Sequence, residues 1–349
     1  MSKRKDNPFT LTFGKQPFKQ IARYEENETI VSTFDSEHPI SQAYLIEGLR
    51  GSGKTVLMTT VANTLSKDDA WMIVNLNSSV DLLTDFAMRL TDVCRKTPNL
   101  LRKGFQLTIG GFGFGVNGDQ QMPDPVGIIS ELLKQVKKKG KKVLITIDEV
   151  RHNESMCIFA SQFQIFIRED APIYLLMTGL HENIEEIIND PALTFLLRSP
   201  KMKIEPLSLL QIRRQYKEIF NIDDVMAGEL ALITKGYAFA FQALGMVYWE
   251  NRENKSLEEI LEILDEMLDD FVYKKIWSTL TEKERLIVHA MQDEDTPVKD
   301  IYTKISMQPG SFAKYRDTML EKGVIESNRH GYIAPVLPRF CEIAKMYRV

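Results

Sequence analysis

Residues 48–55 read Gly-Leu-Arg-Gly-Ser-Gly-Lys-Thr and match the pattern Gly-x4-Gly-Lys-Ser/Thr. An apolar stretch at 43–46 precedes them and helical spacing from 54 to 65 follows, which is the context that a phosphate-binding loop requires. Glycines let backbone N–H groups converge on phosphate oxygens, and the helix N-terminus adds partial positive charge. A chance glycine turn is the alternative. The pattern predicts a nucleotide site made by Gly48, Arg50, Gly51, Ser52, Gly53, Lys54, Thr55 and Val56.

A lysine and a threonine in this loop, together with an acidic pair further along the chain, predict phosphoryl chemistry. Lys54 is expected to reach the β- and γ-phosphates, and the Thr55 hydroxyl to bind Mg²⁺. Asp148 and Glu149 follow the apolar run 143–147, and open α/β sheets bind ligands at the carboxyl ends of their strands. Asp148 is therefore expected to hold Mg²⁺ with Thr55, and Glu149 to act as general base on water. Taken alone, the acidic pair also fits a helix cap after a strand.

Apolar strands alternate with helices over the first part of the chain. Runs at 71–76, 143–147, 173–177 and 201–204 read as buried strands. Continuous apolar strands joined by helices predict an α/β fold with a parallel sheet covered on both faces. Past Pro206 the pattern is helical only, and three short helices from Thr281 lead to a predicted hairpin at 324–335. We expect a core at 1–205, a helical lid at 206–276 and a C-terminal module at 277–349.

The loop at 48–55 and the pair Asp148-Glu149 resemble the Walker A and Walker B motifs of P-loop ATPases that carry an added catalytic glutamate. Within that group the chain is similar to the initiator-type AAA+ ATPases, the archaeal-type ATPase family and the STAND-type signalling ATPases. The resemblance implies a P-loop NTPase three-layer core with a helical lid, and ATP and Mg²⁺ as ligands.

The same resemblance implies roles for three further residues. Thr178, after strand 173–177, matches a polar sensor, with a satisfied strand-end hydroxyl as the alternative. Arg198 matches an arginine that reaches the γ-phosphate of a neighbouring subunit, which implies a homo-oligomer; the alternative is an arginine that caps a helix C-terminus. Arg23 lies in a segment that resembles an Arg-x-x-Glu box beside the adenine base.

The lid departs from the initiator pattern, because residues 234–242 contain no sensing arginine. This segment looks more like the Gly-x-Pro element of STAND ATPases, with Ala238 in place of proline. Lys235 is a candidate for nucleotide contact. We expect an ATPase that couples its nucleotide state to DNA binding or oligomer assembly. The alternative is a STAND-type switch whose output is protein association.

The C-terminal module resembles a winged helix-turn-helix, in which the third helix reads the major groove of double-stranded DNA. Its net charge is near zero, so affinity depends on how its charges are distributed. A winged helix used for protein contacts is the alternative. The predicted DNA contacts are Ser311, Lys314, Tyr315, Arg316 and Arg329.

Composition limits the remaining possibilities. The chain has 349 residues and a net charge of −4, which excludes a protein that coats nucleic acid by bulk positive charge. Its 3 cysteines lie far apart and exclude a disulfide framework. No apolar run approaches the roughly 18 residues of a membrane span. We expect a cytoplasmic, Mg²⁺-dependent and slow ATPase with no membrane partner, and a hairpin of unassigned role at 105–116.

Overall fold

Five parallel strands form the central sheet of the computed structural model, which describes residues 6–12, 21–100 and 124–348. The strand order is β2-β3-β4-β1-β5, and every neighbouring pair is parallel, as the sequence predicted. The hairpin predicted at 105–116 lies outside the described residues. The strands are β1 (Ala43–Glu47), β2 (Trp71–Leu76), β3 (Lys142–Ile147), β4 (Ile173–Gly179) and β5 (Lys201–Lys203).

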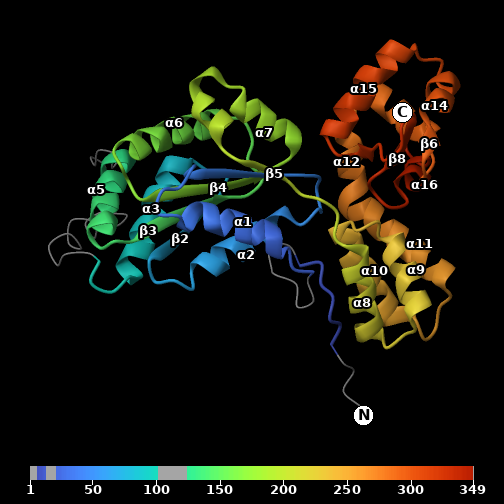
Figure 1. Ribbon diagram of the computed structural model, residues 1–349, viewed down its shortest axis with the longest axis horizontal. Helices are drawn as coiled ribbons and strands as arrows, with labels where there is room; N and C mark the ends of the chain where they lie inside the picture. Colours follow the sequence, from blue (N-terminus) through green and yellow to red (C-terminus); the bar gives the residue numbers. More distant parts are fainter. Residues whose placement is uncertain (1–5, 13–20, 101–123, 349) are drawn as a thin grey trace, which may run out of the picture. The chain divides into compact units, whose positions relative to one another are not determined.

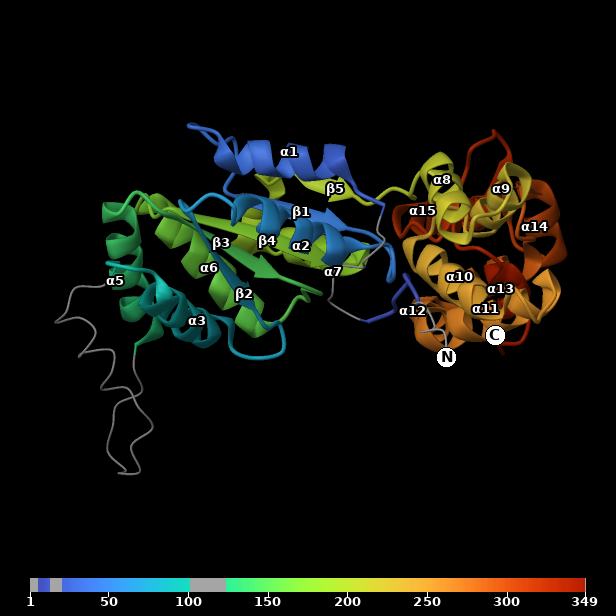
Figure 2. The same ribbon diagram turned by 90° about the horizontal axis from the view of Figure 1, so that it is seen from below.

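Helices cover both faces of this sheet (Figures 1 and 2). One face carries α1 (Tyr24–Asp35) and α2 (Lys54–Leu65). The opposite face carries α3 (Leu82–Lys96), α5 (Pro125–Lys138), α6 (Glu154–Arg168), α7 (His181–Ile188) and the 3₁₀ helix η1 (Pro191–Arg198). The result is the three-layer α/β arrangement expected from continuous apolar strands.

Side chains along each strand point alternately to the two faces of the sheet, so neighbouring residues pack against different helical layers. Leu45 and Leu175 pack with α3, α5 and α6 in one core. The residues next to them, Tyr44 and Tyr174, point to the other face, since successive strand side chains alternate. There Phe34 of α1 meets the Tyr174 ring at 5.5 Å and the Tyr44 ring at 6.2 Å. Both faces of the sheet are therefore buried, which explains its uninterrupted apolar runs.

The chain divides into two compact units. The sheet unit holds residues 23–47 and 54–203, and the helical unit holds residues 48–53 and 204–348 together with the described N-terminal segment up to Ala22. The six residues 48–53 of the phosphate-binding loop thus group with the helical unit, although the strand before them and the helix after them belong to the sheet unit. No helix in the described ranges is both long enough and apolar enough to span a membrane.

The helical unit begins with the helices of the predicted lid and ends in a winged-helix arrangement. In this second part a three-stranded antiparallel sheet, in the order β6-β8-β7, shares one core with four helices of 5 to 13 residues. Strand β6 was not predicted. The elements are α8 (Leu209–Phe220), α9 (Asp224–Ile233), α10 (Ala238–Asn251), α11 (Leu257–Leu268), the π-helix η2 (Asp269–Tyr273), α12 (Lys274–Thr279), α13 (Glu282–Ala290), β6 (Thr296–Pro297), α14 (Val298–Lys304), α15 (Pro309–Glu321), β7 (Ile325–Glu326), β8 (Tyr332–Pro335) and α16 (Phe340–Ala344).

One continuous core runs through this unit. Phe9, from the N-terminal segment, packs on Tyr216 and Phe241 with ring centroids 5.9 and 5.7 Å apart. Tyr273 packs edge-on against Phe340 of α16 at 5.0 Å and donates a hydrogen bond of 2.6 Å to the Pro338 carbonyl. Because the lid and the winged helix share this core, their division at residue 276 remains a prediction.

Candidate nucleotide site

Three side chains predicted from separate motifs meet at the carboxyl ends of β3 and β4. The Thr55 hydroxyl donates to Oδ2 of Asp148 at 2.7 Å. The Thr178 hydroxyl donates to Oδ1 of the same carboxylate. Thr178 is fully buried and pairs in register with Ile46 of β1, so the sheet itself fixes its position. The result is a hydroxyl–carboxylate–hydroxyl cluster of hard oxygen atoms, the donor type that Mg²⁺ prefers.

Glu149 adopts a backbone conformation that a glutamate rarely takes, with φ at +51°. Such a conformation costs about 1–3 kcal/mol and persists only where the surroundings impose it. Here the Glu149 N–H donates to Asp148 Oδ1 at 3.0 Å, and the next N–H, of Val150, donates to the Thr178 carbonyl at 2.8 Å. These hydrogen bonds therefore fix the backbone of Glu149 and of the residue after it against Asp148 and Thr178.

The phosphate-binding loop joins β1 to α2. Gly51 and Gly53 have φ values of +75° and +97°, which favour glycine. A Cβ atom on Gly51 would lie 2.2 Å from the Tyr237 hydroxyl, so the space above it admits no side chain. Lys54, the first residue of α2, is 8% exposed. The loop therefore has the conformation that its glycines predicted, and a tyrosine of the lid restricts it further.

Two lid residues hold the loop by its backbone carbonyls. The Tyr237 hydroxyl donates to the Arg50 carbonyl at 2.5 Å, and the Phe239 N–H donates to the Gly51 carbonyl at 3.0 Å. Burial raises the pKa of Tyr237 well above its usual value, so its hydroxyl keeps the proton that it donates. The lid segment that lacks a sensing arginine thus makes its contact with the loop through a tyrosine.

Lys235 lies on the other side of the same lid segment. Its ammonium donates to the Asp293 carbonyl and, at 3.0 Å, to the Pro335 carbonyl, both in the winged helix. Burial lowers the pKa of Lys235, with the nearby Asp293 acting in the opposite direction. Nucleotide contact was one hypothesis for this lysine, but the structure uses it to link the lid to the winged helix.

Two predicted arginines occupy different environments. Arg198 is the last residue of η1, is exposed, and has no ion-pair partner within residues 6–12, 21–100 and 124–348. Arg23 precedes α1, and its guanidinium contacts the Glu26 carboxylate at 3.0 Å. The Arg-x-x-Glu spacing is therefore realised as an ion pair across one helical turn.

The winged helix presents the predicted DNA contacts unevenly. Ser311 and Lys314 are exposed on α15, whereas Tyr315 is half-buried against the core. Arg316 forms an ion pair of 2.7 Å with Asp317. Arg329, on the wing, lies 4.2 Å from the centre of the Tyr332 ring. Two side chains are thus fully available, and two cations already have local partners.

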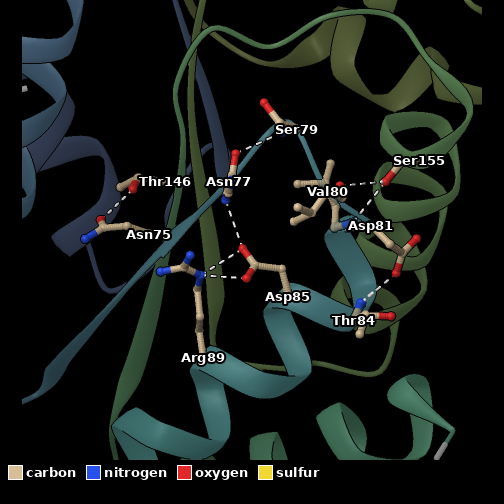
Figure 3. Close-up of polar contacts among 11 residues, drawn as sticks. Asn75, Asn77, Ser79, Val80, Asp81, Thr84, Asp85, Arg89, Thr146 and Ser155 are labelled. Atoms are coloured by element: carbon tan, nitrogen blue, oxygen red, sulfur yellow. Dashed lines mark hydrogen bonds and ion pairs between the residues drawn. The ribbon is translucent and has the colours of Figure 1, made fainter. Parts of the chain in front are cut away.

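Polar contacts along the β2–α3 turn fix the start of α6, which follows the acidic pair (Figure 3). The Ser155 hydroxyl accepts a hydrogen bond of 2.9 Å from the Leu82 N–H. Asp85, 5% exposed, accepts from the Asn77 N–H at 2.9 Å and from Arg89 at 2.8 Å. The Leu82–Ser155 bond joins α3 to α6, whereas the Asp85 bonds fix the turn between β2 and α3, as Figure 3 shows.

Two histidines near the strand ends contact carboxylates that lie far from them in the sequence. His152 lies 2.8 Å from a carboxylate oxygen of Asp190, and His181 lies 3.2 Å from one of Glu47. These partners are 38 and 134 residues apart in the chain, and no motif spacing links them.

Comparison with solved structures identifies the fold. A Walker-type ATPase of Pyrococcus abyssi is similar with a TM-score of 0.59 and 11% identity, over 93% of this chain and 95% of that one. The ORC2 protein of Aeropyrum pernix, solved in ADPNP and ADP complexes, is similar with a TM-score of 0.59 and 14% identity, over 96% of each chain. Cdc6p of Pyrobaculum aerophilum is similar with a TM-score of 0.51 and 12% identity, again over 96% of each chain. The chain therefore has the P-loop NTPase fold that these three structures share.

The similarity in fold extends over nearly the whole chain, including the winged helix. Within it, residues 270–342 match the family model described as "Domain of unknown function (DUF8462)". Among proteins of curated function, none matches the sequence. The matched segment runs from η2 into α16 and so contains every strand of the winged helix.

Proposed function

We propose that this protein binds ATP with Mg²⁺ and hydrolyses it slowly, and that nucleotide state governs DNA binding or oligomer assembly through the winged helix. The observation that carries the proposal is the 2.7 Å bond between Thr55 and Asp148, with the Thr178 hydroxyl on the second carboxylate oxygen. A chance glycine turn and an unrelated acidic cap have no reason to meet in this way.

The donor set fits magnesium. Asp148 offers a carboxylate and Thr55 a hydroxyl, and both are hard oxygen ligands. When bound, Mg²⁺ neutralises charge on the nucleotide phosphates. The ADPNP and ADP complexes of the similar ORC2 protein support ATP as the nucleotide.

The protein's own groups have distinct proposed roles. Lys54 contacts the terminal phosphates as a point charge, and the strained Glu149 orients and deprotonates the attacking water. Thr178 holds the Asp148 carboxylate in place. Arg23 is proposed to lie beside the adenine. Arg198, exposed at the end of η1, is free to reach the nucleotide of a second subunit.

The proposal is tested by nucleotide binding and turnover in matched variants. Lys54→Ala should bind ATP weakly and show no turnover. Glu149→Gln should bind ATP as the wild type does and keep it unhydrolysed. Glu154→Gln is the control, because Glu154 is an exposed acid at the start of α6 and should leave turnover unchanged. Normal turnover in Glu149→Gln would remove the role proposed for this glutamate.

The subunit role of Arg198 needs a mixing experiment. Arg198→Ala and Lys54→Ala should each be inactive alone. A mixture should recover part of the activity, because a subunit with intact Lys54 receives Arg198 from its neighbour. Lack of recovery at every mixing ratio would show that Arg198 does not act between subunits.

DNA binding is tested by titration at several salt concentrations, with and without ATP. Arg316→Ala with Arg329→Ala should weaken binding and reduce its salt dependence. Arg214→Ala with Lys255→Ala removes the same charge from exposed lid positions and should change binding little. If no binding occurs at low salt, the DNA part of the proposal fails.

A STAND-type switch is the second candidate function, favoured by the tyrosine contact of the lid. In that case ATP should change self-association, measured by sedimentation, while DNA has no effect on turnover. Tyr237→Phe should then alter the nucleotide dependence of association, since it removes the bond between lid and loop.

A further inference from the structure

Three side chains outside the proposed ATP site converge within the sheet unit. Nε2 of His152 lies 2.8 Å from Oδ2 of Asp190, and Sγ of Cys157 lies 3.5 Å from each of these two atoms. His152 comes from the loop after β3, Cys157 from the first turn of α6, and Asp190 from the residue before η1. One nitrogen, one sulfur and one oxygen thus form a small triangle.

The dimensions of this triangle match those of a tetrahedral metal site. Zinc bonds of about 2.3 Å to sulfur, 2.05 Å to nitrogen and 2.0 Å to oxygen place sulfur about 3.5–3.6 Å from the other two ligands. They place nitrogen and oxygen about 3.3 Å apart. The two distances from Cys157 already have these values, and only the pair of 2.8 Å must widen, by about 0.5 Å.

The residues around the triangle hold its members in place. Oδ1 of Asp190 accepts a hydrogen bond of 2.8 Å from the Ala192 N–H, which leaves Oδ2 directed at His152 and Cys157. The start of α6 is fixed by Ser155, two residues before Cys157 (Figure 3). Such outer contacts orient ligands and strengthen metal binding.

The same geometry argues against a nucleophilic triad. A catalytic histidine uses one ring nitrogen for the nucleophile and the other for the carboxylate. Here Nε2 of His152 contacts both Cys157 and Asp190. Burial and the neighbouring Asp190 carboxylate also raise the pKa of the Cys157 thiol, which disfavours a free thiolate.

We propose that His152, Cys157 and Asp190 bind a zinc-type transition-metal ion, with a water molecule as the fourth ligand. Sulfur and imidazole ligands select such ions over Mg²⁺. The site is separate from the proposed Mg²⁺ site and goes beyond ATP hydrolysis. Because His152 follows Glu149 by three residues and Asp190 precedes η1, the ion would join the segments that carry Glu149 and Arg198.

Cobalt(II) titration of the full-length, EDTA-treated protein tests the site directly. The wild type should bind one Co²⁺ with a near-ultraviolet thiolate band and strong tetrahedral bands in the visible range, and Zn²⁺ should displace it. Cys157→Ser should lose the thiolate band and bind about 100-fold more weakly or worse, since even outer-shell changes cost about 10–100-fold. Zn²⁺ should raise the thermal unfolding midpoint of the wild type but not of Cys157→Ser.

Three controls separate the possible outcomes. Cys94→Ala removes a buried thiol elsewhere and should keep the thiolate band. His181→Asn removes the other histidine–carboxylate pair and should also keep it. Asp148→Asn should leave Co²⁺ binding intact, so that failure of the ATPase proposal and failure of this one are distinguishable. A missing thiolate band in the wild type, or one retained in Cys157→Ser, overturns the proposal.

Discussion

Gly51→Ala would place a methyl group where the Tyr237 hydroxyl now lies, only 2.2 Å from the new carbon. The left-handed backbone at Gly51 costs an alanine about 1–2 kcal/mol. Overlap with the hydroxyl adds about 1–3 kcal/mol, the range for overpacked sites. Tyr237→Phe alone removes the hydrogen bond to the Arg50 carbonyl and should cost about 1–2 kcal/mol.

The double variant should be less destabilised than the sum of its parts. Phenylalanine removes the oxygen that overlaps with the methyl group, so only the backbone and hydrogen-bond costs remain, about 2–4 kcal/mol together. The nearest atoms are then the ring carbon and Phe239 Cβ, each at 3.0 Å. The coupling between Gly51 and Tyr237 should equal the overlap cost, about 1–3 kcal/mol.

Urea unfolding of the wild type, the two single variants and the double variant measures this coupling as a double-mutant cycle. The tryptophan fluorescence must then report on the helical unit alone. Trp249 and Trp277 belong to that unit, so the variants are made in a Trp71→Phe background. Gly53 gives a matched control with Tyr237→Phe, because its φ is also positive but its Cβ would meet only Ala238, at 3.6 Å. The reasoning is refuted if the Gly51 cycle is additive within about 0.5 kcal/mol, or if the Gly53 cycle shows equal coupling.

Three further predictions concern the helical unit. The pKa of Lys235 is lowered in the folded protein from its ordinary value of 10.5, so the folded lysine binds fewer protons than the unfolded one. Its contribution to the free energy of unfolding therefore rises with pH up to about 10.5. Lys235→Met should flatten this rise, measured by urea unfolding at a series of pH values. Lys322→Ala should lower the free energy of unfolding in urea by about 3 kcal/mol, because the Glu284 carboxylate, 1% exposed, loses the Lys322 ammonium 3.0 Å from its Oε1. Adding Glu284→Gln should recover part of this loss. Gly245→Ala should lower the thermal midpoint by displacing the Phe9 ring, 2.4 Å from the new carbon, and should cost little in a Phe9→Ala background.

The polar cluster was predictable because parallel strands bring their carboxyl ends to one edge. Asp148 and Thr178 each end an apolar run, and Thr55 follows the glycine loop, so strand order alone predicts that they meet. The left-handed backbone of Glu149 was not predictable, since glutamate has no preference for it. It results from hydrogen bonds on both sides of the residue, which exist only in the folded sheet.

The elements that were missed or shifted have local causes. Strand β6 contains only Thr296 and Pro297, and a strand of two residues with a proline has no recognisable pattern. It forms because β8 pairs with it. The sequence predicts a helix over 311–321, but helix α15 starts at Pro309, because proline is well suited to the first turn of a helix, where its missing N–H costs nothing.

The side chains of Lys235 and Tyr237 and the N–H of Phe239 connect the winged helix to the phosphate-binding loop through backbone carbonyls. Lys235 bonds the carbonyls of Asp293 and Pro335, and Tyr237, two residues later, bonds the carbonyl of Arg50. Because every acceptor is backbone, the partner residues leave no trace in the sequence, and only the lysine and the tyrosine carry the specificity. A displacement of the carbonyls at either end must therefore stretch these bonds or move the lid segment between them, and the proposed coupling of nucleotide state to the winged helix would use this connection.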